Sequence, residues 1–190
     1  MTIRTTLQRA IRPSATRSTA ALWGKSLLNA VLFFLVFMVA LPALADHLLP
    51  REIPLPRGLR LGLAGGLAIA GIAAWVACLD VFSRHGRGTP LPADAPRHLV
   101  TRGLFRHVRN PIMAGELGVI WAVALFLSSV GAALYAAAIS IVAHLLVVHV
   151  EEPELLARFG ESYAEYCRTT PRWLPVLGRR RARPPEGPAA

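Results

Sequence analysis

An uncharged stretch at residues 117–150 restricts the possible folds of this chain more than any other feature. It contains no lysine, arginine, aspartate or glutamate. One straight helix of that length would measure about 50 Å, whereas the hydrocarbon core of a bilayer is about 30 Å thick. The Ser-Ser-Val-Gly sequence at residues 128–131 is the only plausible turn near its middle. We therefore expect an antiparallel hairpin of two membrane spans, residues 112–129 and 132–150.

Two more uncharged runs, residues 26–45 and 61–79, are each long enough to cross a bilayer as a helix. In the second run Gly62, Gly66 and Ala70 recur every fourth residue, which predicts a stripe of small side chains where another helix packs closely. Together with the hairpin, these runs predict an all-α integral membrane protein with four transmembrane helices.

The chain has a formal net charge of +10, and the arginines that produce it flank the apolar runs. This pattern indicates orientation against a membrane rather than binding of nucleic acid. Basic residues gather before the first span, in the loop between the second and third spans, and after the fourth span. The positive-inside rule then places both the N and the C terminus in the cytoplasm, and a bacterial inner membrane is the expected host.

The chain divides into four parts by composition. Residues 1–25 form a basic tail, for which a mitochondrial transit peptide is the alternative interpretation. Residues 26–79 carry the first two transmembrane helices, and residues 80–175 carry a loop, the hairpin and one further helix. Residues 176–190 are expected to form a basic, disordered tail near anionic lipid.

The further helix is predicted at residues 153–167, directly after the hairpin. Leu155, Phe159, Tyr163 and Tyr166 recur there at helical spacing, with charged residues on the opposite face. Such an amphipathic helix is expected to lie along the inner membrane surface.

The two cysteines, Cys78 and Cys167, lie far apart in the sequence. Neither has the close cysteine and histidine spacing that a structural metal site requires. We therefore expect neither a disulfide nor a bound metal ion.

Charges of both signs should meet where the hairpin begins and ends. Arg106 and Arg109 precede its first helix, and Glu151 and Glu152 follow its second. One interpretation is a structural salt-bridge cluster that anchors the helices. The other is a site for a zwitterionic ligand, because arginine can pair with a carboxylate, glutamate can hold an ammonium, and helix N-termini favour anions. S-adenosylmethionine has these groups, and charge alone would equally allow a phospholipid headgroup.

The motifs around the hairpin resemble those of a known family. The sequence LVTRGLFRHVRNP, ending at Pro111, precedes the hairpin, and EEPELLARFGESYAEYCRTTPRWLP, beginning at Glu151, follows it. This order resembles the isoprenylcysteine carboxyl methyltransferase family, in which an Arg-His-Pro or Arg-Asn-Pro box precedes a hydrophobic stretch and a Glu-Glu pair. Related phospholipid and small-thiol methyltransferases share the pattern. The resemblance covers residues 86–175.

The resemblance implies a membrane-embedded methyltransferase that depends on S-adenosylmethionine. The expected acceptor is hydrophobic or membrane-associated: an isoprenylcysteine carboxylate, another lipophilic or prenylated molecule, a lipid or a thiol. The expected partners are this acceptor and membrane lipids, with no nucleic acid. The alternative is a catalytically silent membrane protein that keeps the fold as a structural or lipid-binding module.

The family's cofactor contacts, carried over by motif together with the neighbouring charges, imply a set of binding residues. These are Arg97, His98, Leu99, Val100, Phe105, Arg109, Asn110, Pro111, Met113, Glu151 and Glu152. Two positions depart from the family pattern. Met113 stands where the family has tyrosine, and Val147 stands where isoprenylcysteine enzymes have an arginine thought to meet the substrate carboxylate.

Glu116 and His144 are the candidate catalytic residues. A carboxylate acceptor needs no base, whereas an amine or a thiol must lose a proton before it can attack. Both residues lie within the hairpin at similar depth, roughly 7–10 Å from their helix ends, and ionisable residues inside a membrane usually serve a function. The alternatives are a Glu116–His144 packing pair, or a bond from His144 to a backbone carbonyl.

Overall fold

The computed structural model of this chain describes residues 31–81 and 99–175. Within those ranges every regular element is a helix, which confirms the all-α prediction. In chain order they are the π-helix η1 (Phe34–Ala40), α3 (Leu41–Leu48), α4 (Arg57–Val81), the 3-10 helix η4 (Gly103–Arg106), α5 (Pro111–Leu127), α6 (Val130–Leu146), the π-helix η5 (Val147–Glu151), α7 (Glu152–Phe159) and α8 (Glu161–Thr169).

Within the described ranges, three helices are long and apolar enough to cross a membrane: Val31–Leu48, Arg57–Val81 and Val130–Phe159. The fourth predicted span is the shorter apolar helix α5, with 17 residues. Many large apolar side chains of α3, α4 and α6 face outward, as lipid contact requires. The chain is thus an integral membrane protein. Residues 1–30 and 176–190 lie outside the described ranges, and the orientation stays a prediction.

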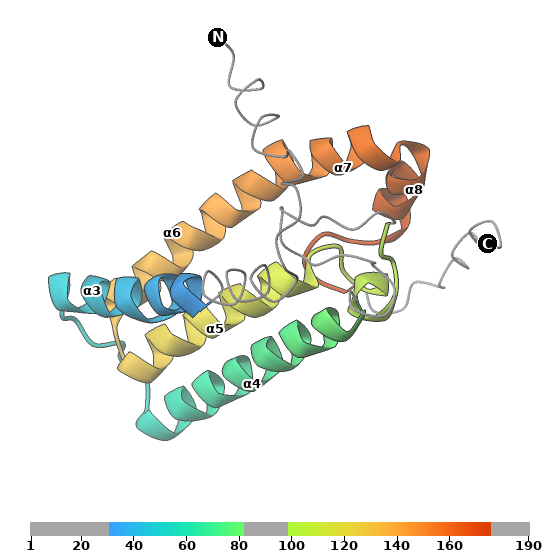
Figure 1. Cartoon of the computed structure of the whole chain (residues 1–190). Coiled ribbons are helices and arrows are strands. Elements are labelled where there is room, and N and C mark those ends of the chain that lie inside the picture. The colour runs from blue at the N-terminus through green and yellow to red at the C-terminus, as the bar shows by residue number, and fades with distance from the viewer. Residues whose placement is uncertain (1–30, 82–98, 176–190) are drawn as a thin grey trace, which may run out of the picture.

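The helices pack in a fixed order (Figure 1). The most extensive contact joins α4 to α5, and α3 packs against α6. Helices α5 and α6 lie close at their shared turn and separate toward the start of α5, while α8 folds back from α7. Trp121 of α5 donates a hydrogen bond to Ser140 of α6 at 3.3 Å, and Tyr135 of α6 donates to the Phe37 carbonyl at 2.9 Å.

The hairpin turn lies at Ser128 and Ser129, as predicted. Ser128 adopts the left-handed conformation (φ 58°), and the Ser129 hydroxyl accepts a hydrogen bond from the Ala132 amide at 3.0 Å, which caps α6. The preceding connection crosses this turn. The Ile53 amide donates to the Ser128 carbonyl at 2.9 Å, and the Val130 amide donates to the Arg51 carbonyl at 2.8 Å. Backbone hydrogen bonds therefore join the connection between α3 and α4 to the turn between α5 and α6.

The first two helices extend beyond their predicted ends. The first continues to Leu48 through Asp46 and His47, and the second begins at Arg57. The prediction that each helix stops at the first charged residue was wrong, because a charged side chain near a helix end can form favourable contacts there. Arg60, inside α4, donates to the carbonyls of Leu125 and Phe126 at 2.7 Å each. Both carbonyls lie in the last turn of α5, where a cation is favourable, and the Leu125 carbonyl also accepts from the Ser128 amide at 3.1 Å.

The prediction that another helix packs closely on Gly62, Gly66 and Ala70 is wrong, since all three residues are exposed. The buried positions of α4 are Ala64, Gly71 and Cys78, seven residues apart. A Cβ atom on Gly71 would lie 2.5 Å from the Gly115 carbonyl oxygen of α5. The helices cross at these two glycines. Small residues on the other face of α4 meet no helix, and spacing alone does not tell the two faces apart.

The single amphipathic helix predicted at residues 153–167 is also wrong. The second hairpin helix continues without interruption to Phe159, because the π-helix η5 precedes Pro153, whose ring nitrogen cannot donate a helical hydrogen bond. The break comes at Gly160, which has φ 55°. Helix α8 follows and buries Tyr163 and Tyr166 inside the protein. Its apolar face therefore packs against protein.

The crossing at Gly71 predicts opposite effects for two similar substitutions in α4. Gly71→Ala should lower the thermal unfolding midpoint in detergent, because the new methyl group meets backbone atoms, a clash that costs about 1–3 kcal/mol. The control Gly66→Ala meets nothing within 4 Å and should keep or slightly raise the midpoint. Equal midpoints for both variants would contradict the observed crossing.

Candidate functional site

The carboxylate of Glu152 lies at the centre of a charged cluster where α5 begins, which we call the open end of the hairpin. Arg172 contacts both carboxylate oxygens, with Nε–Oε1 at 2.7 Å and Nη2–Oε2 at 2.9 Å. Arg109 contacts Oε1 through Nη1 at 3.1 Å. The side chains of Arg109 and Glu152 are 11% and 16% exposed, so water screens this pair only weakly. The predicted meeting of opposite charges is confirmed for Arg109 and Glu152.

Arg109 is held tightly but incompletely. Its Nη1 also donates to the Cys167 sulfur of α8. Its Nε is buried and has no hydrogen-bond partner in the described part of the chain. A buried donor without an acceptor costs about 1–3 kcal/mol, and proteins rarely leave one unsatisfied. The cluster thus has a cationic donor in place for one further acceptor, and a ligand carboxylate has the matching chemistry.

Residues 170–173, which we call the strap, connect the two helices of the hairpin at the open end. The Arg109 amide donates to the Pro171 carbonyl at 2.9 Å, and the Asn110 amide donates to the Arg172 carbonyl at 3.3 Å. On the other side, Trp173 Nε1 donates to His144 Nδ1 of α6 at 3.0 Å. The strap therefore spans the separation between the start of α5 and the helix that carries Glu152.

Two tyrosines of α8, Tyr163 and Tyr166, are buried near the charged cluster. Burial raises the pKa of Tyr166 above its ordinary value, and burial, with Cys167 nearby, also raises the pKa of Tyr163. Both phenols stay neutral over the physiological range. Tyr166 donates its hydroxyl proton to the Phe105 carbonyl at 2.6 Å, which fixes α8 to η4. The pKa of Arg172 is also raised, because its charged form donates to Glu152.

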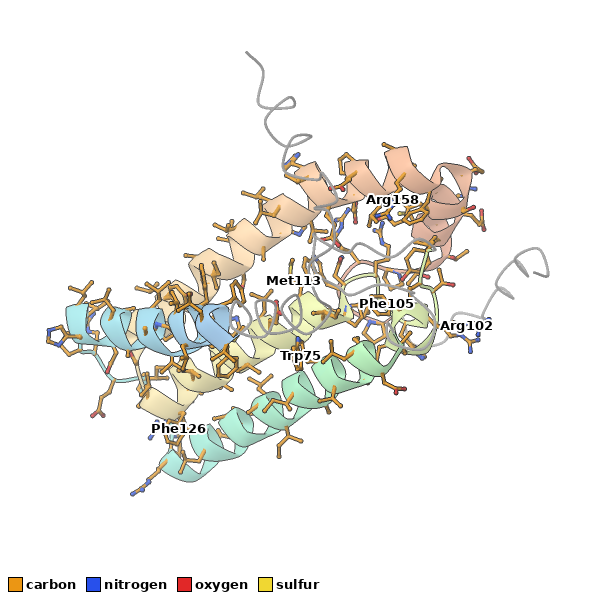
Figure 2. All side chains as sticks on the ribbon, in the orientation of Figure 1. Trp75, Arg102, Phe105, Met113, Phe126 and Arg158 are labelled. Atoms are coloured by element: carbon orange, nitrogen blue, oxygen red, sulfur yellow. The ribbon has the colours of Figure 1, made fainter. Side chains whose placement is uncertain are left out.

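Those predicted cofactor residues that the structure describes fall at one end of the bundle. Arg97 and His98 lie outside the described residues. Leu99 and Val100 are half-buried and lead into η4, where Phe105 is buried. In Figure 2, Phe105 and Met113 lie toward the end of the bundle opposite Phe126.

Asn110 and Pro111 form the beginning of α5. Asn110 is the N-cap residue, but its side chain makes no capping bond and donates instead to the Arg172 carbonyl at 3.4 Å. Pro111 occupies the first helical position, where its missing N–H leaves no donor unsatisfied. The Arg-Asn-Pro box is therefore the structural junction between α5 and the strap.

The two glutamates of the pair have different surroundings. Glu152 is engaged by both arginines, whereas Glu151 is exposed and has no hydrogen bond or ion pair in the described ranges. Arg106, which was expected in the cluster, is exposed and does not contact Glu152. Arg172 was missed by the sequence analysis. Because it follows the chain reversal at Gly160, helical spacing could not place it opposite Glu152.

The two candidate catalytic residues do not pair with each other. His144 accepts from Trp173, a partner different from the two considered in the sequence analysis. Glu116 is half-buried on α5 and has no hydrogen bond or ion pair among the described residues. Glu116 is thus a carboxylate inside the hairpin that the fold itself does not use.

An open groove of about 420 Å³ lies beside the cluster, between η5–α7 and α8. Its walls are Val148, Glu152, Pro153, Leu156, Tyr163, Ala164 and Cys167. Most of these side chains are apolar, while Glu152 and Cys167 belong to the charged cluster. An apolar surface thus adjoins the polar site.

Comparison with known proteins places the chain in a family. The family model for phospholipid methyltransferases matches residues 60–162, from α4 into α8. Methanethiol S-methyltransferase 2 of Bradyrhizobium diazoefficiens is 36% identical over 149 residues, covering 69% of this chain and 54% of that protein. The chain therefore spans about half the length of this curated relative. The family model covers more than half of this chain, and with the motifs around the hairpin it shows that the chain belongs to the phospholipid methyltransferase family.

Proposed function

We propose that this protein is a membrane methyltransferase that binds S-adenosylmethionine at the open end of the hairpin. The observation that carries the proposal is the buried Nε of Arg109, which has no partner in the described part of the chain. The carboxylate of Glu151, next to Glu152 in the chain, likewise has no ion pair among the described residues. The first matches a ligand carboxylate and the second a ligand ammonium. Family membership supports methyl transfer as the reaction. The basic loops support a site that faces the cytoplasm, and the bacterial relative supports a bacterial inner membrane.

The residues present fit this cofactor. Arg109 would hold its carboxylate and Glu151 its ammonium, while Leu99, Val100, Phe105 and Met113 would supply apolar contacts. S-adenosylmethionine supplies a methyl group on a positively charged sulfur. The remaining tasks of the protein are to align the acceptor with that methyl group and to exclude water. The apolar interior of the hairpin suits the exclusion of water.

We propose a thiol as the acceptor. The relative's name, methanethiol S-methyltransferase 2, supports this class of acceptor. Val147 supports it independently, since it is fully buried and aliphatic where isoprenylcysteine enzymes have an arginine. A prenylcysteine carboxylate would find no cation at this position. A lipid amine is the alternative acceptor.

A thiol must lose its proton to become a strong nucleophile, and we propose Glu116 as the base. His144 is less suited. Because an indole N–H can only donate, Nδ1 of His144 must accept from Trp173, and the neutral ring then carries its proton on Nε2. Neither ring nitrogen is left to take a proton. Glu116 has a free carboxylate at a similar depth in the hairpin.

Calorimetric titration of S-adenosylmethionine into detergent-purified protein tests the cofactor proposal. The parent should bind, and Glu151→Gln should weaken binding by about tenfold or more, since the amide removes the charge that holds the ammonium. Glu52→Gln is the matched control. Glu52 is exposed in the connection before α4, at the turn end of the bundle, and should have no effect. A well-folded parent that binds no cofactor would support the silent lipid-binding alternative.

Methyl transfer to methanethiol tests the assignment of the base. Glu116→Gln should lower kcat by roughly 10²–10⁴-fold, the usual contribution of a positioned base, while cofactor binding and thermal stability stay near the parent's. His144→Ala should lower kcat by less than about tenfold. Normal turnover in Glu116→Gln would eliminate Glu116 as the base, and a larger loss in His144→Ala would reverse the assignment.

A further inference from the structure

The strap contacts the open end through several polar groups. It bonds to the start of α5 through two backbone amides and to α6 through His144. Between these contacts, Arg172 reaches Glu152 with two parallel hydrogen bonds. Such a planar, two-pronged contact fixes the orientation of a carboxylate as well as its position.

The contact of Arg172 limits what Arg109 can do. Arg172 uses both oxygens of Glu152, so Arg109 reaches only Oε1, through one terminal nitrogen. The Nε of Arg109 is left without an acceptor in the described part of the chain. Without Arg172, both carboxylate oxygens would be open to Arg109. The Arg109 guanidinium could then turn its Nε–Nη2 edge toward Glu152, and this two-pronged pair would satisfy Nε within the protein.

We infer that Arg172 is a positioning residue that acts through Glu152 to keep Arg109 available for a ligand carboxylate. Arg172 itself need not touch the ligand. By occupying Glu152 it prevents Arg109 from closing onto that carboxylate. This inference deepens the proposed function and rests on it, since the ligand carboxylate is the one assigned to S-adenosylmethionine. It also makes the strap a part of the binding site.

The chain offers a natural contrast in Arg168, four residues earlier. Arg168 also forms ion pairs, with Glu161 and Glu165 at 2.6 Å each, but its side chain is 58% exposed. Both partners belong to α8, and neither belongs to the cluster around Glu152. Arg168 therefore has the chemistry of Arg172 without its position.

Cofactor titration of four variants tests the inference. Arg172→Ala should weaken S-adenosylmethionine binding by about tenfold, within the range of coupling inside one ion-pair network. Adding Glu152→Gln to Arg172→Ala should restore at least about threefold of that loss, because the amide no longer pairs Arg109 as an ion. A purely structural role for Arg172 predicts no such recovery. Arg172→Lys keeps the charge but cannot make the two-pronged contact, so it should also weaken binding. Arg168→Ala should bind like the parent.

The outcomes separate the inference from the proposed function. If the folded parent does not bind the cofactor, both are overturned. If the parent binds and the Arg172 variants bind equally well, only the inference is overturned. The inference alone is also overturned if Arg172→Ala weakens cofactor binding and the added Glu152→Gln substitution restores none of the lost affinity. Thermal unfolding midpoints of all variants identify a folding defect, and Arg172→Lys serves as the informative variant if Arg172→Ala does not fold.

Discussion

One carboxylate shared by two arginines holds the open end of this protein together. At the turn end, the hairpin helices are joined by a two-residue turn, and backbone bonds from the preceding connection cross it. At the open end they separate, and the contact of Glu152 with Arg109 and Arg172 links them together with the backbone and Trp173 contacts of the strap. Breaking a buried ion pair on one side leaves an uncompensated charge, which is strongly destabilising. The geometry of every group around Arg109 therefore depends on this arrangement.

The parts of the fold that the sequence predicted depend on the hydrophobic effect and on bilayer thickness. An uncharged run too long for one span must turn, and the serine pair was the place where it could. The hairpin then brings the segments that carry Arg109 and Glu152 to the same end of the bundle, and tertiary contacts decide which of the charges there meet. Family motifs added the expected cofactor residues around the same point. These residues remain an assignment to be tested by binding.

The parts that the sequence did not predict depend on tertiary contacts. The close helix crossing uses Gly71 and Gly115, while Gly62 and Gly66 on the same helix face outward, and both kinds of glycine are acceptable in an apolar helix. Arg172 could not be placed because Gly160 reverses the chain before it. The different surroundings of Glu151 and Glu152 follow from that same reversal. The spacing of apolar residues along a helix shows which face of the helix is apolar, but it does not show which other part of the protein packs on that face.

The position of the strap along the chain has a consequence for biosynthesis. Arg172 and Trp173 emerge from the ribosome after both helices of the hairpin. The arrangement of two arginines around Glu152 therefore cannot be complete until the strap has been made. The hairpin and the segments beside it supply Arg109 and Glu152, and the strap adds Arg172 and the contact of Trp173 with His144. Completion of the cluster is thus one of the last steps in assembling the described part of the chain.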